Sequence, residues 1–186
     1  LNVDRQSEMV AELHDRFPCV RHAAFEPVLS KDLFATVAAL EDFYARFVDH
    51  IFPAITLGRT LGLSIGNTVI NNVGSVKLRS CSGKLVVTPH GELTACSRLS
   101  SPIEPHYEVF RYGKITPYGQ VRWDAERYIG LMSCNASAYA ECRSCIAKFH
   151  CSGGCLLARK SLPTDYFAAY CRFNREMVAR TLHESI

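Results

Sequence analysis

The chain has 186 residues, of which 48% are hydrophobic and 21% charged, and its formal net charge is +3 at pH 7. These values are typical of a globular protein and exclude a disordered or fibrous chain. Because the basic residues form no Lys/Arg run and no aromatic-basic pattern, we expect no nucleic-acid partner. The most apolar region contains Pro53 and Arg59 and falls short of a membrane helix of about 18 residues, so we expect a soluble, cytoplasmic protein without a membrane partner.

The first residues, LNVDRQSEMV, have neither an initiator Met nor the pattern of a signal peptide, and we expect them to continue a longer protein. Residues 4–16 predict a short helix, and the stretch from Cys19 to Pro27 predicts a strand. Glu26 ends this strand and is the candidate catalytic residue. At the end of a barrel strand its carboxylate would face an active site, whereas a solvated loop acid is the alternative.

A long amphipathic helix is predicted from Ser30, whose side chain is a suitable N-cap. Its apolar residues recur at three- and four-residue steps, at Leu33, Val37, Leu40, Tyr44, Phe47 and Ile51. The glycines at 58, 62 and 66 favour loops and a helix end. A strand followed by such a helix is the unit of an α/β barrel or layered sheet, so residues 1–73 are interpreted as the edge of a larger domain.

The stretch NNVGS, residues 71–75, has turn chemistry and marks a boundary, after which a second domain covers residues 74–186. KLVVTP, the turn HG and ELTACS predict a β-hairpin in which Gly91 supplies the turn conformation. VFRYGKI predicts a further strand, and helices are expected over residues 124–132 and 165–183. The fold class expected is therefore α+β.

The chain has nine cysteines, at positions 19, 81, 96, 134, 142, 145, 151, 155 and 171. The odd number and the chain length disfavour a disulfide scaffold. Four of the thiols fall within ECRSCIAKFHCSGGC, residues 141–155, and thiolates at such spacing select zinc, copper(I) or iron–sulfur species. Ser152, Gly153 and Gly154 lack bulk, so the backbone there can approach an inorganic core. Cys81 and Cys96 stand at the two ends of the predicted hairpin.

The combined spacing resembles the SPASM domain, the C-terminal extension of many radical S-adenosylmethionine enzymes. The resemblance covers roughly residues 81–175 and rests on the spacing C-x9-G-x4-C, then C-x2-C-x5-C-x3-C and a final Cys. The stretches TPHGELTACS and CSGGC are also similar to the family. The resemblance implies two auxiliary [4Fe–4S] clusters, with residues 1–73 as the last strand and helix of a partial barrel and its linker. The chain lacks the C-x3-C-x2-C motif of these enzymes. S-adenosylmethionine and a third [4Fe–4S] cluster are therefore expected only in a full-length enzyme, and this chain alone should be inactive.

The resemblance also implies a crossed set of ligands. It assigns Cys81, Cys96 and Cys155 to the first cluster, and the second cluster takes Cys142, Cys145, Cys151 and Cys171. Cys134 is the candidate for a fourth ligand of the first cluster, and an ordinary buried thiol is the alternative. Cys19 is expected in the core. Structural zinc and, less readily, disulfides are the other interpretations of the cysteines, while His90 and His150 are expected as exposed loop residues.

The function implied by the resemblance is that of a radical S-adenosylmethionine oxidoreductase that modifies a ribosomally made peptide or protein. This chain would relay an electron to or from an external donor or acceptor and help to shape the substrate pocket. Ser97 stands where the sulfatase-maturing branch has an acid, which favours peptide maturation and leaves sulfatase maturation as the runner-up. The alternative from another class is a stand-alone zinc or iron–sulfur module that binds a partner or passes electrons.

Overall fold

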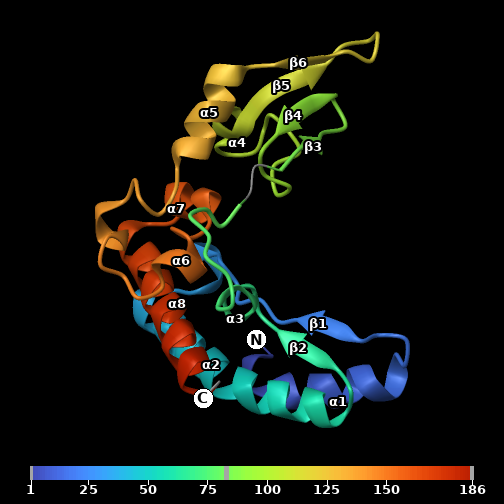
Figure 1. Cartoon of the computed structure of the whole chain (residues 1–186), viewed down its shortest axis with the longest axis vertical. Helices are drawn as coiled ribbons and strands as arrows, with labels where there is room; N and C mark the ends of the chain where they lie inside the picture. Colours follow the sequence, from blue (N-terminus) through green and yellow to red (C-terminus); the bar gives the residue numbers. More distant parts are fainter. Residues whose placement is uncertain (1, 82–83, 185–186) are drawn as a thin grey trace. The chain divides into compact units, whose positions relative to one another are not determined.

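The computed structural model describes residues 2–81 and 84–184 and divides the chain into two compact units (Figure 1). Unit 1 comprises Leu1–Val76 and Leu162–Ile186, and unit 2 comprises Lys77–Ser161. With 51% helix and 10% strand, the chain has the mixed α and β content that was expected. The finer predictions, a partial barrel and a SPASM domain, stay predictions. The described part of the chain has no helix long and apolar enough to cross a membrane.

Three helices form most of unit 1: α1 (Gln6–Arg16), α2 (Val37–Thr60) and α8 (Thr164–Glu184). The N-cap of α2 is Thr36, whose side chain accepts a hydrogen bond from Ala39 N at 3.2 Å. Ser30 instead caps the short 3-10 helix η2 (Lys31–Leu33) and accepts from Asp32 N. The predicted N-cap of the long helix was therefore wrong by six residues, because Ser30 and Thr36 are both good caps and the chain uses one for each helix.

Helix α8 packs along α2 through aromatic side chains (Figure 1). The Phe173 ring stacks on Tyr44 at a centroid distance of 4.7 Å and meets Phe47 edge-on at 5.6 Å. Four phenylalanines of this unit are buried, at positions 34, 43, 47 and 52. The expected second domain, residues 74–186, therefore differs from the compact units, because the apolar face of α8 is buried in unit 1. Residue 1, where the first expected domain begins, and residues 185–186, where the second ends, lie outside the described residues.

A two-stranded parallel sheet completes unit 1. Strand β1 (His22–Ala24) pairs with β2 (Ser64–Gly66), and the short helix α3 (Thr68–Asn72) follows. Strand β2 lies in the glycine-rich stretch where a loop was expected. Gly58 lets β2 approach α2, since a Cβ at this position would lie 2.5 Å from Ile65 Cγ1. The order β1, α2, β2 contains the expected unit of a strand followed by a helix. The sheet that these strands form has two strands in the described part of the chain.

Unit 2 contains a four-stranded antiparallel sheet in the order β3 (Val86–Val87), β4 (Glu92–Thr94), β5 (Arg111–Ile115) and β6 (Val121–Trp123). The predicted hairpin is confirmed as β3 and β4, with Val87 opposite Leu93 and Gly91 at a φ of 73°. The predicted strand VFRYGKI is divided. Its first residues belong to helix α4 (Tyr107–Phe110), and the remainder is β5.

Four further helical segments connect the cysteines of unit 2. They are α5 (Ala125–Ser133), the 3-10 helix η3 (Ala140–Cys142), α6 (Lys148–Cys151) and α7 (Leu156–Ser161). The predicted helix at 124–132 is confirmed, and the Asp124 side chain caps α5 by accepting from Arg127 N at 3.0 Å. The core between the sheet and these helices consists of apolar residues, namely Leu93, Ala95, Leu99, Tyr107, Phe110, Tyr112, Leu131 and Leu157.

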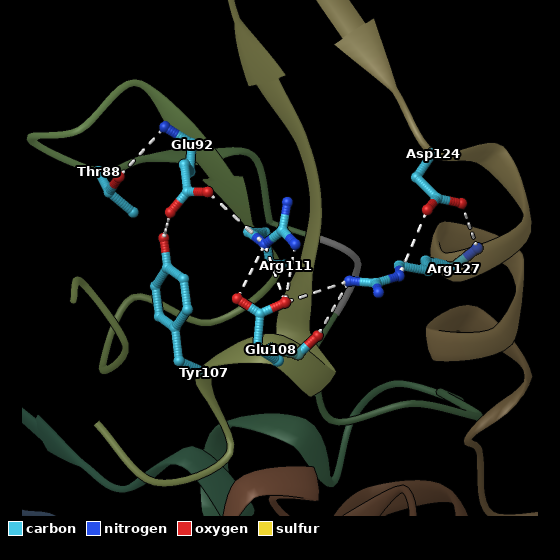
Figure 2. A network of polar contacts seen from close by, with 7 residues as sticks. All are labelled: Thr88, Glu92, Tyr107, Glu108, Arg111, Asp124 and Arg127. Carbon is cyan, nitrogen blue, oxygen red and sulfur yellow. Dashed lines mark hydrogen bonds and ion pairs between the residues drawn. The ribbon is translucent and has the colours of Figure 1, made fainter. Parts of the chain in front are cut away.

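A polar network fastens β4, α4, β5 and α5 to one another (Figure 2). The buried Tyr107 donates its hydroxyl to Glu92 at 2.6 Å, and Glu92 also lies 3.6 Å from Arg111. Arg111 pairs with Glu108 at 2.7 Å, and Arg127 at the start of α5 reaches the same carboxylate at 3.5 Å. The network therefore holds the start of β4 and the start of α5, the two elements that lead to Cys96 and Cys134.

Candidate metal centre

Four cysteines from separate segments of unit 2 line one cavity. Cys81, Cys96, Cys134 and Cys155 all contribute to its wall, and its volume is about 40 Å³. One water needs about 10–15 Å³, so the cavity can accept a larger group. The other lining residues are mostly apolar: Arg79, Ser80, Ala95, Phe110, Leu131, Met132, Gly154, Leu156 and Leu157.

Cys96 is positioned by the end of strand β4. The Thr94 side chain is fully buried, and its hydroxyl makes hydrogen bonds with Cys96 O at 3.0 Å and Leu99 O at 3.2 Å. Leu99 N also donates to Cys96 O at 3.2 Å, so Cys96 lies at the start of a tight turn. Cys96 and Cys155 are both half-buried and pack against the core of unit 2.

Cys134 is the C-cap residue of helix α5. Its N–H donates to Leu131 O at 3.2 Å, and its thiol lies 3.6 Å from Gly130 O. Cys134 lies on the same cavity wall as Cys81, Cys96 and Cys155, and its role as a fourth ligand stays a prediction. The structure thus brings together the three expected ligands of the first cluster and the candidate for the fourth.

Cys81 is exposed as a residue, yet its thiol is partly shielded at the cavity wall. Partial burial raises the pKa of this thiol, the neighbouring Cys155 and Cys96 raise it further, and Lys84 opposes them. The three thiols are thus close enough to interact electrostatically. Residues 82–83, the first two of the spacing between Cys81 and Gly91, lie outside the described residues.

The side chain of Arg79 adds a positive charge to the wall of the cavity. Its Nη1 donates to Met132 O at 3.4 Å and also contacts the Met132 sulfur. Among the described residues, no group of three or more His, Cys, Asp or Glu is arranged to hold a single metal ion.

A second group of thiols lies in the knuckle loop, residues 141–154. Cys142 ends η3, Cys145 lies in the turn that follows, and Cys151 ends α6. Cys145 N donates to Cys142 O at 3.3 Å and Cys151 N donates to Ala147 O at 2.8 Å, so backbone hydrogen bonds fix the spacing. Cys142 is buried, and this burial raises the pKa of its thiol.

The end of the knuckle loop has an uncommon backbone conformation. Ser152, Gly153 and Gly154 all have positive φ, at 57°, 84° and 75°. Ser152 is buried, and its hydroxyl makes hydrogen bonds with Lys77 O at 3.0 Å and Phe149 O at 3.2 Å. The side chain of Ser152 thereby offsets the cost of its left-handed conformation, and the chain can turn sharply between Cys151 and Cys155.

Two predicted residues lie in unit 1. Cys171 is half-buried on helix α8, and its role in the second ligand set stays a prediction. Cys19 is exposed, so its expected place in the core was wrong. The reason is that α1 ends at Arg16 and the chain turns through Pro18 and Cys19 on the surface before β1 begins.

Glu26 fastens strand β1 to the start of helix α3. Its carboxylate accepts hydrogen bonds from Thr68 N at 2.7 Å, from Thr68 Oγ1 at 2.6 Å and from Asn67 Nδ2 at 3.1 Å. Both carboxylate oxygens are thus engaged within unit 1, which supports a structural role. His90 is exposed as expected, whereas His150 is half-buried on helix α6, so its expected place in an exposed loop was wrong.

Sequence reasoning missed Arg159, whose guanidinium lies 4.0 Å from Cys142 Sγ. Its position four residues after Cys155 on a helix was a usable signal, because residues i and i+4 share a helix face.

Comparisons with protein-family models, with curated proteins and with solved structures found no match to this chain.

Proposed function

We propose that unit 2 binds an iron–sulfur cluster through Cys81, Cys96, Cys155 and Cys134, and that the chain is the auxiliary-cluster part of a radical S-adenosylmethionine enzyme. One observation carries the proposal: four thiols from separate segments line the same cavity. The sequence resemblance had assigned three of these cysteines to one cluster and named the fourth as a candidate. The cavity and the resemblance therefore agree on Cys81, Cys96 and Cys155, and the cavity adds Cys134.

The arrangement of the thiols favours a cluster over a single zinc ion. A zinc–sulfur bond of about 2.3 Å places the sulfurs of a tetrahedral site about 3.8 Å apart. The four thiols line the wall of a cavity that is larger than a single water needs. A cluster carries its ligands at the corners of an extended core, which suits thiols on the wall of a cavity.

The lining of the cavity also suits iron–sulfur chemistry. Ala95, Phe110, Leu131 and Leu157 are buried and limit the access of water to the thiols. A hydrophobic shell of this kind controls solvent access and so influences the reduction potential of a bound centre. When bound, the cluster would supply one-electron exchange with an external donor or acceptor. The residues of this chain hold the thiolates and exclude water.

The substrate class in this proposal is a ribosomally made peptide or protein. It rests on the resemblance, in which Ser97 favours peptide maturation over sulfatase maturation. Hydrogen abstraction from the substrate, and the S-adenosylmethionine that it requires, belong to a full-length enzyme that has the C-x3-C-x2-C motif. The contribution of this chain is electron relay and part of the substrate pocket.

The cavity can be tested by cysteine substitution followed by anaerobic reconstitution with iron and sulfide. Cys96→Ser should abolish the cluster of the cavity, so the bound iron should fall by about four per chain. Cys134→Ser should cause a similar loss if Cys134 is the fourth ligand. Cys19→Ser is the matched control, since Cys19 is exposed and outside the cavity, and it should retain the parent iron content. Equal iron contents in the Cys96 and Cys19 variants would contradict the proposed site.

A further inference from the structure

Strand β6 forms an open edge of the sheet in unit 2. Its one neighbour in the sheet is β5, and no described strand pairs with its other side. Asp124 N donates to Tyr112 O at 2.7 Å, and in an antiparallel ladder only every second residue turns its backbone groups toward the partner strand. The backbone groups of Val121 and Trp123 therefore point to the open edge, where they can pair with another chain.

The apolar side chains of β6 lie beside this edge. Val121 and Trp123 share one face of the sheet, since they are two residues apart on a strand, and they are 44% and 56% exposed. The Trp123 ring is nevertheless held in place. It stacks on Tyr112 at a centroid distance of 5.6 Å and meets Tyr128 of α5 edge-on at 6.1 Å. A ring fixed in this way can bury apolar area of a partner while losing little side-chain entropy.

The opposite face of β6 carries an uncompensated positive charge. Arg122 lies directly opposite Lys114 of β5 in the register of the sheet, so two positive side chains stand side by side. Both residues are exposed, and neither forms an ion pair within the described part of the chain. Like charges at directly opposed positions are destabilising, and a negatively charged partner would remove this repulsion.

The carboxylates next to this pair along the sheet are already engaged (Figure 2). Glu92 lies opposite Lys114, but its carboxylate accepts a hydrogen bond from a buried tyrosine hydroxyl at 2.6 Å and lies 3.6 Å from Arg111. Asp124, which follows β6, caps α5 and lies 3.3 Å from Arg127. The charge that would complement Lys114 must therefore come from another molecule.

We propose that the edge of β6 binds an extended segment of a peptide or protein in which acidic and apolar residues alternate. The segment adds an antiparallel strand to the sheet, and its backbone pairs with Val121 and Trp123. Its apolar side chains lie on the face of Trp123, and its acidic side chains lie beside Lys114 and Arg122. This inference goes beyond the proposed function and needs no bound cluster, because the residues that carry it belong to β5 and β6.

Trp123 makes such binding directly measurable, since it is the only tryptophan of the chain and lies at the proposed interface. The experiment titrates the full chain with a capped synthetic peptide of alternating glutamate and valine and follows the tryptophan fluorescence. We expect a saturable change whose affinity falls as salt is added. A matched peptide of alternating lysine and valine should not bind.

Two N-methylated forms of the glutamate–valine peptide test the pairing of the backbone. In an antiparallel strand the N–H groups of the valines face β6, whereas those of the glutamates point away from it. Methylation at the valines should therefore abolish binding, and methylation at the glutamates should preserve it. Equal affinities of the two methylated peptides would overturn the inference.

Charge reversal on the protein tests the role of the basic pair. Lys114→Glu and Arg122→Glu should each weaken the affinity by about fivefold or more, while each replaces a repulsive pair by an attractive one and should not lower stability in urea. A loss of binding therefore cannot come from a loss of fold, which circular dichroism also checks. Arg175→Glu on the exposed side of α8 is the matched control and should bind like the parent.

Three results would contradict the inference. The first is an unchanged affinity in both Lys114→Glu and Arg122→Glu, and the second is equal binding of the lysine–valine peptide. The third is tighter binding of a single-stranded oligonucleotide than of the glutamate–valine peptide, because this anion has no backbone that can extend a sheet. None of these results bears on the cavity of unit 2, so the proposed function would stand or fall separately.

Discussion

Replacing Gly153 by alanine should destabilise unit 2 more than the same replacement of Gly119. Both glycines have positive φ, at 84° and 75°, so alanine is strained at either position. Gly119 lies in the turn between β5 and β6, and a Cβ there would have no heavy atom within 4 Å. At Gly153 a Cβ would lie 3.2 Å from Ala136 N and 3.2 Å from the Tyr139 ring. The pair therefore separates backbone strain from crowding in the knuckle loop.

The expected difference follows from these contacts. Left-handed backbone in an L-residue costs about 1–2 kcal/mol, and this cost applies to both variants. Crowding of a well-packed site adds about 1–3 kcal/mol, and only Gly153→Ala should show it. The Tyr139 ring cannot move freely, because Arg159 stacks on it at 3.7 Å. We therefore expect Gly153→Ala to lower the free energy of unfolding by about 2–5 kcal/mol and Gly119→Ala by about 1–2 kcal/mol.

Urea unfolding followed by tryptophan fluorescence measures this difference. Trp123 is the only tryptophan of the chain and lies on β6, so its signal reports on unit 2. The slope of the transition should match the parent in both variants, since neither changes the surface exposed on unfolding. Equal losses of stability for Gly153→Ala and Gly119→Ala would refute the packing described for the knuckle loop.

Three further substitutions test the two units. Phe173→Ala should lower the stability of unit 1 by about 3–5 kcal/mol, because a buried ring is lost from between α8 and α2. Circular dichroism in urea measures this loss, and a loss below about 1 kcal/mol would contradict this packing. Tyr107→Phe removes the hydrogen bond to Glu92 and should cost about 1.5–3 kcal/mol in the Trp123 signal, whereas no change would show that the bond is not formed. Burial raises the pKa of Tyr44, so its contribution to stability is present below about pH 10 and is lost as the pH rises toward the folded-state value. Tyr44→Phe should therefore unfold at a higher alkaline pH than the parent, and an identical alkaline midpoint would contradict this assignment.

Local patterns predicted the larger elements well. The hairpin at Gly91 and the helix after Asp124 are confirmed, because turn and cap residues act on their immediate neighbours. Strand β2 was missed, since Ser64–Gly66 is three residues long and includes a glycine. Its pairing with β1 depends on Gly58, which makes room for Ile65, and no local pattern shows this contact.

Long-range placement could not be predicted from the same patterns. Helix α8 was predicted, but the pattern of a helix does not identify its packing partner, and Phe173 packs on Tyr44 in unit 1. The spacing of the cysteines grouped Cys81, Cys96 and Cys155 through the resemblance alone, and the cavity shows that these thiols are neighbours. Cys134 has no distinctive spacing. Its place on the cavity wall depends on the length and direction of α5.

The central claim is that unit 2 binds an iron–sulfur cluster through the thiols of its cavity. The most direct measurement is anaerobic reconstitution with iron and sulfide, followed by counting iron, sulfide and zinc per chain and recording the Mössbauer spectrum. The account predicts iron in [4Fe–4S] form, up to about eight irons and eight sulfides if both thiol groups are filled. One or two tightly held zinc ions with no retained iron would contradict it and would leave unit 2 as a structural metal domain.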